Sequence, residues 1–459
     1  MNPPGLRSRR GTVALVLVSL VCAGLALRPE PGGAAVVTAA RPLWAPDRLP
    51  GLLAEAQGTV DLGRAVDELL GGSGARTCLA VYEGSRPVLL RRPDDRLTPA
   101  STQKLLVATA ALATLGPDFR FETRVLADTK PRDGKVGTLW LVGAGDPTLA
   151  TPEYAIWLTA RPRYALRQFT PLAALADGLV AAGVRTVTGS VVGDDSRYDR
   201  TRTVPTWKPS YITDNEVGPL GALLVNDGFT VFDAPKEVRA DDPAVHAAGE
   251  LTRLAGEVGI AVGGPPVPGQ APAGAVPVAT VRSAPLADLV ANMLRESDNT
   301  AAELLTRELG VARARAGSTA AGTEAVVDDL TAAGFPTAGL RLGDGSGLEA
   351  TNTATCTVLA AALRAPGPAG GPRLEPLLAV AGRSGTLALR LADTPLDGKL
   401  RAKTGSLDGV SGLAGYLDGR RALSFAFLAN GRFTDAAGRL LQDRLTALLA
   451  AYPGPQPHL

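Results

Sequence analysis

Three short polar motifs lie far apart in this chain of 459 residues, and any fold that uses them together must bring distant segments into one cleft. Each motif alone would be a common occurrence in a sequence so rich in Ala and Leu. Together, in this order and at predicted element boundaries, they are hard to obtain by chance. The motifs are Ser101-Thr102-Gln103-Lys104, Ser297-Asp298-Asn299 and Lys403-Thr404-Gly405-Ser406.

Composition narrows the chemistry that these motifs can carry. Of the two histidines, His458 lies in a Pro-rich tail, so a Ser-His-Asp triad or a histidine metal site would rest on His246 alone. Lysine is also scarce, with seven residues against forty arginines, yet Lys104 and Lys403 both fall in the motifs. Because arginine keeps its proton in proteins, these lysines suit base chemistry that a guanidinium cannot perform. We expect a serine and lysine site without a metal or other cofactor.

The charge balance limits the possible partners of the chain, and its length limits the number of domains. Basic residues number 47 and acidic residues 45, and no block of like charge stands out, so we expect no nucleic-acid partner. The hydrophobic content of 45% is ample for buried cores, and the chain is too long for one ordinary domain. We expect two or three domains.

The N-terminus predicts export. Three arginines precede an uncharged apolar run at 12–27, and small residues near its end suit a signal peptidase, so residues 1–26 are interpreted as a signal peptide. An uncleaved membrane anchor is the alternative, although the run falls short of the roughly 20 residues that a span needs. Residues 27–50, rich in Pro, Ala and Gly, are interpreted as a linker. We expect a protein of the extracytoplasmic cell envelope or a secreted protein, associated with a membrane only if the segment is uncleaved.

Two cysteines follow this segment, Cys78 and Cys356. In an oxidising compartment they could pair, but they lie far apart in sequence, on a predicted strand and a predicted helix of one domain. Their pairing stays open, and free buried thiols are slightly favoured.

The segments around the first and third motifs predict an α+β domain. Alternating apolar residues indicate strands, and the apolar helix that carries the first motif should be buried. The elements describe a five-stranded antiparallel sheet with helices on both faces, assembled from two distant parts of the chain. The expected helices are 60–70, the helix that begins near Thr98, and 435–451; the expected strands are 76–82, 87–91, 400–405, 409–417 and 422–429.

The long segment between the first and second motifs predicts an insertion. Neighbouring elements of one cleft do not need so many residues, and this segment has alternating strands at 121–127, 137–142 and 184–192 and a helix at 171–182. We interpret it as one or two inserted β-rich domains. The predicted division is 51–121 plus 285–452 for the catalytic domain, 122–284 for the insertion and 453–459 for a flexible tail.

The first motif is placed to supply a serine nucleophile. With Thr98 as N-cap and Pro99 in the first turn, Ser101 lies at a helix start, where unpaired amides favour a developing anion. Lys104 shares its helix face and can take the hydroxyl proton only when neutral. Burial and repulsion from Lys403 would lower the pKa of Lys104 from about 10.4 toward about 7. For this motif alone, an exposed or salt-bridged Lys104 is the alternative.

The second motif would complete the proton path. Ser297 would relay a proton to the leaving amine, and Asn299 would hold both Lys104 and the substrate backbone. Taken alone, Ser297-Asp298-Asn299 is also an ordinary N-cap cluster ahead of a helix expected at 300–309, which should stop at Gly310.

The third motif lies on a predicted edge strand, so a substrate could add to the sheet as a further strand. Lys403 and Thr404 would grip its terminal carboxylate, Gly405 would leave room for its approach, and Ser406 completes the binding segment. The backbone amides of Ser101 and Ser406 would form the oxyanion hole.

These motifs resemble those of the D-alanyl-D-alanine carboxypeptidase/endopeptidase family, the class C penicillin-binding proteins of low molecular mass. The resemblance runs from about residue 50 to 451 and includes the large insertion. It implies a β-lactamase/transpeptidase-like fold, cleavage of the D-Ala ends and cross-bridges of peptidoglycan stem peptides, and acylation by β-lactam antibiotics. It also implies catalytic positions at Ser101, Lys104, Ser297, Asn299, Lys403 and Thr404. Further matching segments are 145–149, 344–348, 385–387 with Arg390, 402–407 and 415–416.

Two other functions compete with this interpretation. Class A β-lactamases share the literal S-D-N, but they lack so long a gap, and no carboxylate here is a clear deacylating base, since Glu303 should face outward or pack on the sheet. A catalytically idle envelope protein that binds peptides is the second alternative, which the complete set of motifs disfavours.

Overall fold

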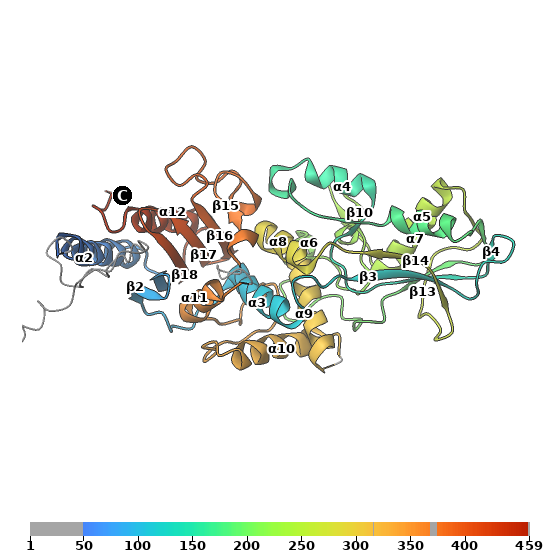
Figure 1. Ribbon diagram of the computed structural model, residues 1–459, viewed down its shortest axis with the longest axis horizontal. Coiled ribbons are helices and arrows are strands. Elements are labelled where there is room, and N and C mark those ends of the chain that lie inside the picture. The colour runs from blue at the N-terminus through green and yellow to red at the C-terminus, as the bar shows by residue number, and fades with distance from the viewer. Residues whose placement is uncertain (1–48, 315, 368–373, 458–459) are drawn as a thin grey trace, which may run out of the picture. The chain divides into compact units, whose positions relative to one another are not determined.

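The computed structural model describes residues 49–314, 316–367 and 374–457 (Figure 1). Leu53–Leu459 form one unit, and the preceding unit, Met1–Leu52, lies almost wholly outside the described residues. The predicted signal peptide and nearly all of the predicted linker fall in that part. Within the described ranges, no helix is both long and apolar enough to cross a bilayer.

A six-stranded antiparallel sheet forms the centre of the part that carries the motifs (Figure 1). The five expected strands are all present, and the two-residue strand β15 adds a sixth at the edge. The sequence therefore predicted the sheet correctly apart from this short addition. In spatial order the strands are β15 (Ala379–Val380), β16 (Leu400–Leu407), β17 (Val410–Asp418), β18 (Ala422–Asn430), β1 (Arg76–Glu83) and β2 (Arg86–Arg91).

Helices cover both faces of this sheet, which is why its central strands are buried almost end to end. Successive strand residues point to opposite faces, so Leu79 and Val81 pack with α2 and α12, whereas Cys78 and Ala80 pack with the helices of the other face. The first face carries α2 (Leu49–Gly71) and α12 (Asp435–Ala451); the second carries α3 (Lys104–Thr114), α8 (Leu286–Glu296), α9 (Asn299–Ala314), α10 (Thr319–Ala332) and α11 (Cys356–Arg364).

The chain between the first two motifs has its own sheet and its own core. Its main sheet mixes parallel and antiparallel pairs and packs against α5 (Ala173–Ala181) and α7 (Pro243–Glu257). The expected strand at 184–192 is wrong as one element, because the chain changes sheets at Gly189 and forms two strands. The strand order is β13 (Val267–Pro268), β9 (Val191–Asp194), β5 (Leu139–Val142), β3 (Glu122–Ala127) and β14 (Val276–Arg282), and β8 (Thr186–Val187) lies between β12 (Ala261–Val262) and β4 (Lys135–Val136).

Cys78 and Cys356 form a disulfide, with an S–S distance of 2.01 Å and a Cα–Cα distance of 5.8 Å. The slight preference for free thiols was therefore wrong. Cys78 lies on the face of β1 that α11 covers, and Cys356 is the first residue of that helix, so the fold brings together two residues separated by 278 positions.

Two predicted helix ends also differ from the structure. Thr98 is not an N-cap, because its hydroxyl donates to the carbonyl of Ala350, and a 3₁₀ turn, η1 (Ala100–Gln103), precedes α3. Helix α9 does not stop at Gly310. A Cβ there would lie 2.6 Å from the carbonyl oxygen of Ala316 and 2.9 Å from the nitrogen of Gly322, so this glycine permits close packing against α10 instead of ending the helix.

Candidate active site

Ser101 and Lys104 meet at the junction of η1 and α3. Lys104 is completely buried, and its Nζ lies 2.9 Å from the Oγ of half-buried Ser101. Ala100, just before the serine, adopts a left-handed backbone with φ of 46°, which is uncommon for a residue with a side chain. Its carbonyl is packed so closely on Gly347 that a Cβ on that glycine would lie 2.2 Å away. The serine is therefore presented by a strained turn that neighbouring backbone holds in place.

Two further acceptors surround the Lys104 amine. Nζ donates to Asn299 Oδ1 at 2.7 Å and to the carbonyl oxygen of Ser346 at 2.6 Å. When Nζ loses one proton, its two remaining N–H groups can still donate to these two oxygens. The Nζ lone pair is then directed at Ser101 Oγ. The arrangement can thus turn an ammonium into a base aimed at one hydroxyl.

Burial lowers the pKa of Lys104 to about 8. The nearby carboxylates of Asp344, Asp298 and Glu303 oppose this shift, and the Arg163 guanidinium adds to it. The expected direction is therefore right, and the Arg163 guanidinium is a cation that the sequence analysis did not anticipate. With a pKa close to the working pH, a useful fraction of the amine is neutral.

Lys403 is also completely buried and points at the second motif. Its Nζ donates to Ser297 Oγ at 2.8 Å and to the carbonyl oxygen of Thr404 at 2.7 Å. Burial, followed by repulsion from Lys104 and Arg163, lowers its pKa well below the usual value. The amine is enclosed rather than offered to solvent, and its side-chain contact is Ser297.

One residue of the second motif caps a helix, and the other two contact the buried lysines. Ser297 ends α8 with a left-handed backbone, φ 64°, and Asp298 Oδ1 accepts from the backbone amide of Ala301 at 2.8 Å, as an N-cap does. Ser297 and Asn299 instead face the two lysines. The N-cap interpretation is thus correct for Asp298.

Asn299 contacts the insertion as well as Lys104. Its Nδ2 donates to the carbonyl oxygen of Glu216 at 2.7 Å. An amide nitrogen has two hydrogens, so this contact leaves room for one to a substrate.

The third motif lies along β16, where the strand is free on one side. β15 pairs only with Arg401 and Ala402, so the strand from Lys403 onward has no partner there among the described strands. Thr404 is half-buried, with Oγ1 3.2 Å from that of Thr386, and Ser406 is exposed. This free edge is where the sequence analysis expected a substrate strand to add.

Gly405 plays a different part from the one expected. It is buried, and a Cβ on it would lie 2.9 Å from the carbonyl oxygen of Pro99 and 3.1 Å from the nitrogen of Thr102. The missing side chain therefore lets β16 lie against the turn that carries Ser101, rather than making room for a substrate.

Two grooves adjoin these residues and share the 3₁₀ turn η2 (Pro162–Tyr164) of the insertion. One, of about 850 Å³, is lined by Thr404 and Ser406 at the free edge of β16. The other, of about 290 Å³, reaches Ser297 and Asn299. The first groove is lined among others by Arg161, Arg163, Thr386, Arg390, Thr404 and Ser406.

Comparison with known proteins identifies the family. The sequence matches the D-Ala-D-Ala carboxypeptidase 3 (S13) family over residues 64–236 and 231–452. A carboxypeptidase of Mycobacterium tuberculosis is 37% identical over 354 residues, which cover 74% of this chain and 73% of that protein. The chain belongs to the S13 family. A D-alanyl-D-alanine carboxypeptidase of Actinomadura sp. is 31% identical over 440 residues, which cover 79% of this chain and 78% of that one.

Solved structures agree on the fold of this S13 chain. Penicillin-binding protein 4 of Haemophilus influenzae aligns with a TM-score of 0.65 and 22% identity, over 84% of this chain and 99% of that one. A predatory endopeptidase of Bdellovibrio bacteriovorus, acylated by penicillin G, aligns with a TM-score of 0.51 and 17% identity over 84% and 95%. The resemblance seen in the motifs is thus confirmed, and the S13 chain is a hydrolase of the D-Ala-D-Ala carboxypeptidase class.

The sequence analysis of this S13 hydrolase did not predict that Glu303 holds the loop whose Ser346 carbonyl accepts from Lys104. Glu303, expected to face outward or the sheet, is fully buried, and its Oε1 accepts from the amides of Gly345 and Ser346 at 2.9 and 2.7 Å. Burial, followed by the nearby Asp344 carboxylate, raises the pKa of Glu303 to about 8. Asp344 accepts from Gln103, Trp207 and Asn352, among others, so the loop is held from several directions. The segment 344–348, one of those that match the family, was the available signal.

Proposed function

We propose that this protein is a serine D-Ala-D-Ala carboxypeptidase and endopeptidase that acts on peptidoglycan stem peptides through an acyl-enzyme at Ser101, and that β-lactams acylate the same serine. The observation that carries this proposal is the Lys104 amine, which lies 2.9 Å from Ser101 Oγ with two other oxygens around it. Membership of the S13 family supports the reaction class.

In the proposed mechanism, neutral Lys104 takes the proton of Ser101 while Oγ attacks the carbonyl carbon of the penultimate D-Ala. The amides of Ser101 and Ser406 would stabilise the oxyanion. Ser297, held by Lys403 at 2.8 Å, would relay to the departing amine the proton that Lys104 has taken, so that Lys104 is neutral again once the C–N bond has broken. Water then attacks the ester, which releases the shortened peptide and returns the proton to Ser101.

The substrate would lie along the free side of β16, where its backbone can pair with the strand. Thr404 and Ser406 line the adjoining groove and would contact the terminal carboxylate. The guanidinium groups of Arg161 and Arg163 favour an anionic end there. The peptidoglycan substrate agrees with the predicted export signal at 1–26, because stem peptides lie outside the cytoplasmic membrane.

Covalent labelling with a fluorescent penicillin tests the proposal. Ser101→Ala should abolish the label while circular dichroism stays unchanged, and Ser85→Ala, in the exposed β1–β2 turn, should keep it. Label that persists on folded Ser101→Ala would refute the assignment.

The rate at which the label is lost separates the alternatives. Slow hydrolysis of the bound penicillin fits a peptidase, rapid turnover fits a β-lactamase, and absence of any acylation fits a peptide-binding envelope protein. Mass spectrometry of the products from a defined cross-linked muropeptide then distinguishes removal of terminal D-Ala from cleavage of the cross-bridge.

A further inference from the structure

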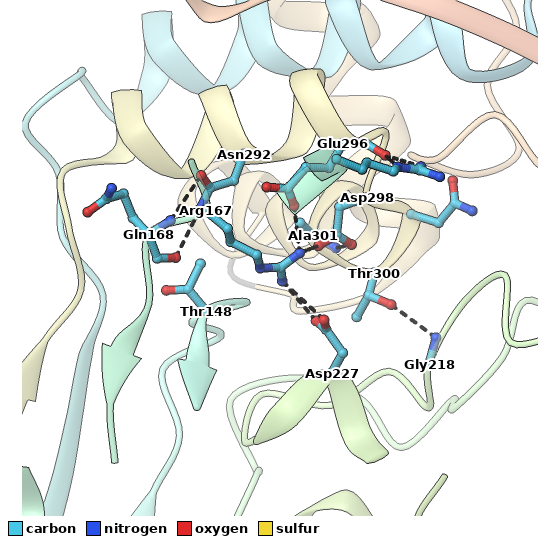
Figure 2. Close-up of polar contacts among 12 residues, drawn as sticks. Thr148, Arg167, Gln168, Gly218, Asp227, Asn292, Glu296, Asp298, Thr300 and Ala301 are labelled. Atoms are coloured by element: carbon cyan, nitrogen blue, oxygen red, sulfur yellow. Dashed lines mark hydrogen bonds and ion pairs between the residues drawn. The ribbon is translucent and has the colours of Figure 1, made fainter. Parts of the chain in front are cut away.

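One buried arginine of the insertion, Arg167, connects three carboxylates around the second motif (Figure 2). Its side chain is only 3% exposed. Nη1 donates to Glu296 Oε2 at 2.8 Å and to Asp298 Oδ2 at 2.9 Å, and Nη2 donates to both carboxylate oxygens of Asp227 at 3.1 Å. Asp227 also belongs to the insertion, in η3 (Asn226–Gly228), so the guanidinium joins the insertion to the motif.

The two motif-side partners of Arg167 are the residues immediately before and after Ser297. A single nitrogen therefore holds the chain on both sides of a residue whose φ is 64°, a left-handed conformation that costs about 1 kcal/mol or more for a residue with a side chain. Arg163, four residues earlier, donates its Nε to the carbonyl oxygen of Glu296 at 3.1 Å and its Nη2 to the same atom. The peptide that leads into Ser297 is thus fixed by two arginines from the insertion.

Both ends of this short segment reach the lysines. Ser297 Oγ accepts from Lys403 at 2.8 Å, and Asn299 Oδ1 accepts from Lys104 at 2.7 Å. A shift of the backbone at Ser297 would therefore change the surroundings of both amines at once.

The cluster is not explained by stability alone. Buried ion pairs repay their desolvation only when the geometry is good, and apolar replacements of the whole group are often no less stable. Here three carboxylates share one guanidinium, and burial raises the pKa of Glu296 to about 7 and that of Asp227 in the same direction. Arginine suits this position because its planar fork reaches several acceptors in fixed directions, whereas lysine offers one nitrogen.

We propose that Arg167 is a positioning residue of the active site, which sets the backbone at Ser297 and thereby aims Ser297 and Asn299 at the two lysines. The insertion would then help to position active-site residues and would be more than an appended domain. The inference rests on the proposed acylation of Ser101.

Arg167→Lys tests the inference, because it keeps the charge and removes the fork. The acylation rate constant at saturating penicillin and the dissociation constant of the complex before acylation are measured separately by stopped-flow fluorescence. We expect the rate constant to fall about 10- to 100-fold, as for other misplacements near 1 Å, while the dissociation constant changes less than about threefold. If Arg167 had only a structural role, the substitution would lower the fraction of folded protein, and the acylation rate constant of the folded protein would not fall relative to the dissociation constant.

Arg197→Lys is the matched control. Arg197 also lies in the insertion and pairs with a buried carboxylate of α9, Glu308, at 2.6 and 2.9 Å, but that contact is more than two turns beyond Asn299. We expect both of its constants to stay within about twofold of those of the unchanged protein. An equal fall in the two variants, or an unchanged rate constant in folded Arg167→Lys, would overturn the inference.

A second variant covers the case in which Arg167→Lys does not fold. Arg163→Met removes an exposed side chain and with it the donors to the Glu296 carbonyl. Above pH 9, where the change in local charge matters least for neutral Lys104, its acylation rate constant should fall at least about fivefold, and an unchanged value would refute the inference. Failure of the proposed function looks different, because the unchanged protein would then not be acylated at Ser101.

Discussion

At the scale of single residues, the site depends on two lysines that burial has taken out of water. Lys104 is surrounded by three oxygens, and its pKa of about 8 means that a fraction of the amine is neutral near neutral pH. The pKa of Lys403 is also well below its usual value, because of burial first and then repulsion from Lys104 and Arg163. The scarcity of lysine pointed to both residues, but only the fold showed that Arg163 acts on each of them.

The pKa of Lys104 predicts the pH dependence of acylation. The base must be neutral, so the rate should be low at pH 6, rise about tenfold per pH unit while the ammonium dominates, and level off above about pH 8. The measurement is the second-order rate constant for labelling by fluorescent penicillin between pH 6 and 10. A rate that falls over the same interval would contradict a lysine base.

At the scale of elements, the closest fit in the site is between strand β16 and turn η1. Gly405 contacts the backbone of Pro99 and Thr102, so the strand that carries the third motif rests directly on the turn that carries Ser101. The five long strands of this sheet and the C-terminal helix could be predicted from periodicity, because alternation and apolar stripes are local properties. The ends of α3 and α9 could not, since Thr98 and Gly310 are used in contacts with distant segments.

Gly405→Ala should therefore damage both stability and activity. The added Cβ would come within 2.9 Å of a backbone oxygen that cannot move away without moving Ser101. We expect a loss of about 1–3 kcal/mol in the free energy of unfolding, measured in urea, together with slower penicillin labelling.

Gly71→Ala is the control for this substitution, because a Cβ at that position, the last residue of α2, meets no atom within 4 Å. Its stability and labelling should match those of the unchanged protein. A Gly405→Ala protein with the same properties would show that the contact is not tight.

At the scale of the whole molecule, the fold joins segments that the insertion separates. The Cys78–Cys356 disulfide connects β1 with α11 and closes a loop that contains the entire insertion. Hydrogen bonds from the insertion to the second motif, through Arg163, Arg167 and Glu216, then meet the site from the other side. The disulfide also suits the oxidising compartment that the predicted export signal implies.

Removing the disulfide should lower stability more than activity. The double variant Cys78→Ala/Cys356→Ala should lose about 2–4 kcal/mol of unfolding free energy, because a cross-link over so long a loop restricts the unfolded chain. Urea denaturation measures the loss, and the unchanged protein with a reductant should show a similar one. Labelling of Ser101 should persist in the folded variant, and equal stability with and without the cross-link would contradict the prediction.

The sequence by itself determined the reaction class of this protein and the five long strands of the sheet that carries the third motif, because the three motifs and the alternation of apolar residues are local properties of the chain. It also indicated that a long insertion interrupts the catalytic part. Only the tertiary structure decided that Cys78 pairs with Cys356, that Glu303 lies beneath the Ser346 loop, and that Arg167 holds the second motif. Each of these is a contact between residues remote in sequence, and whether such groups meet depends on how the packed layers align, which no local pattern records.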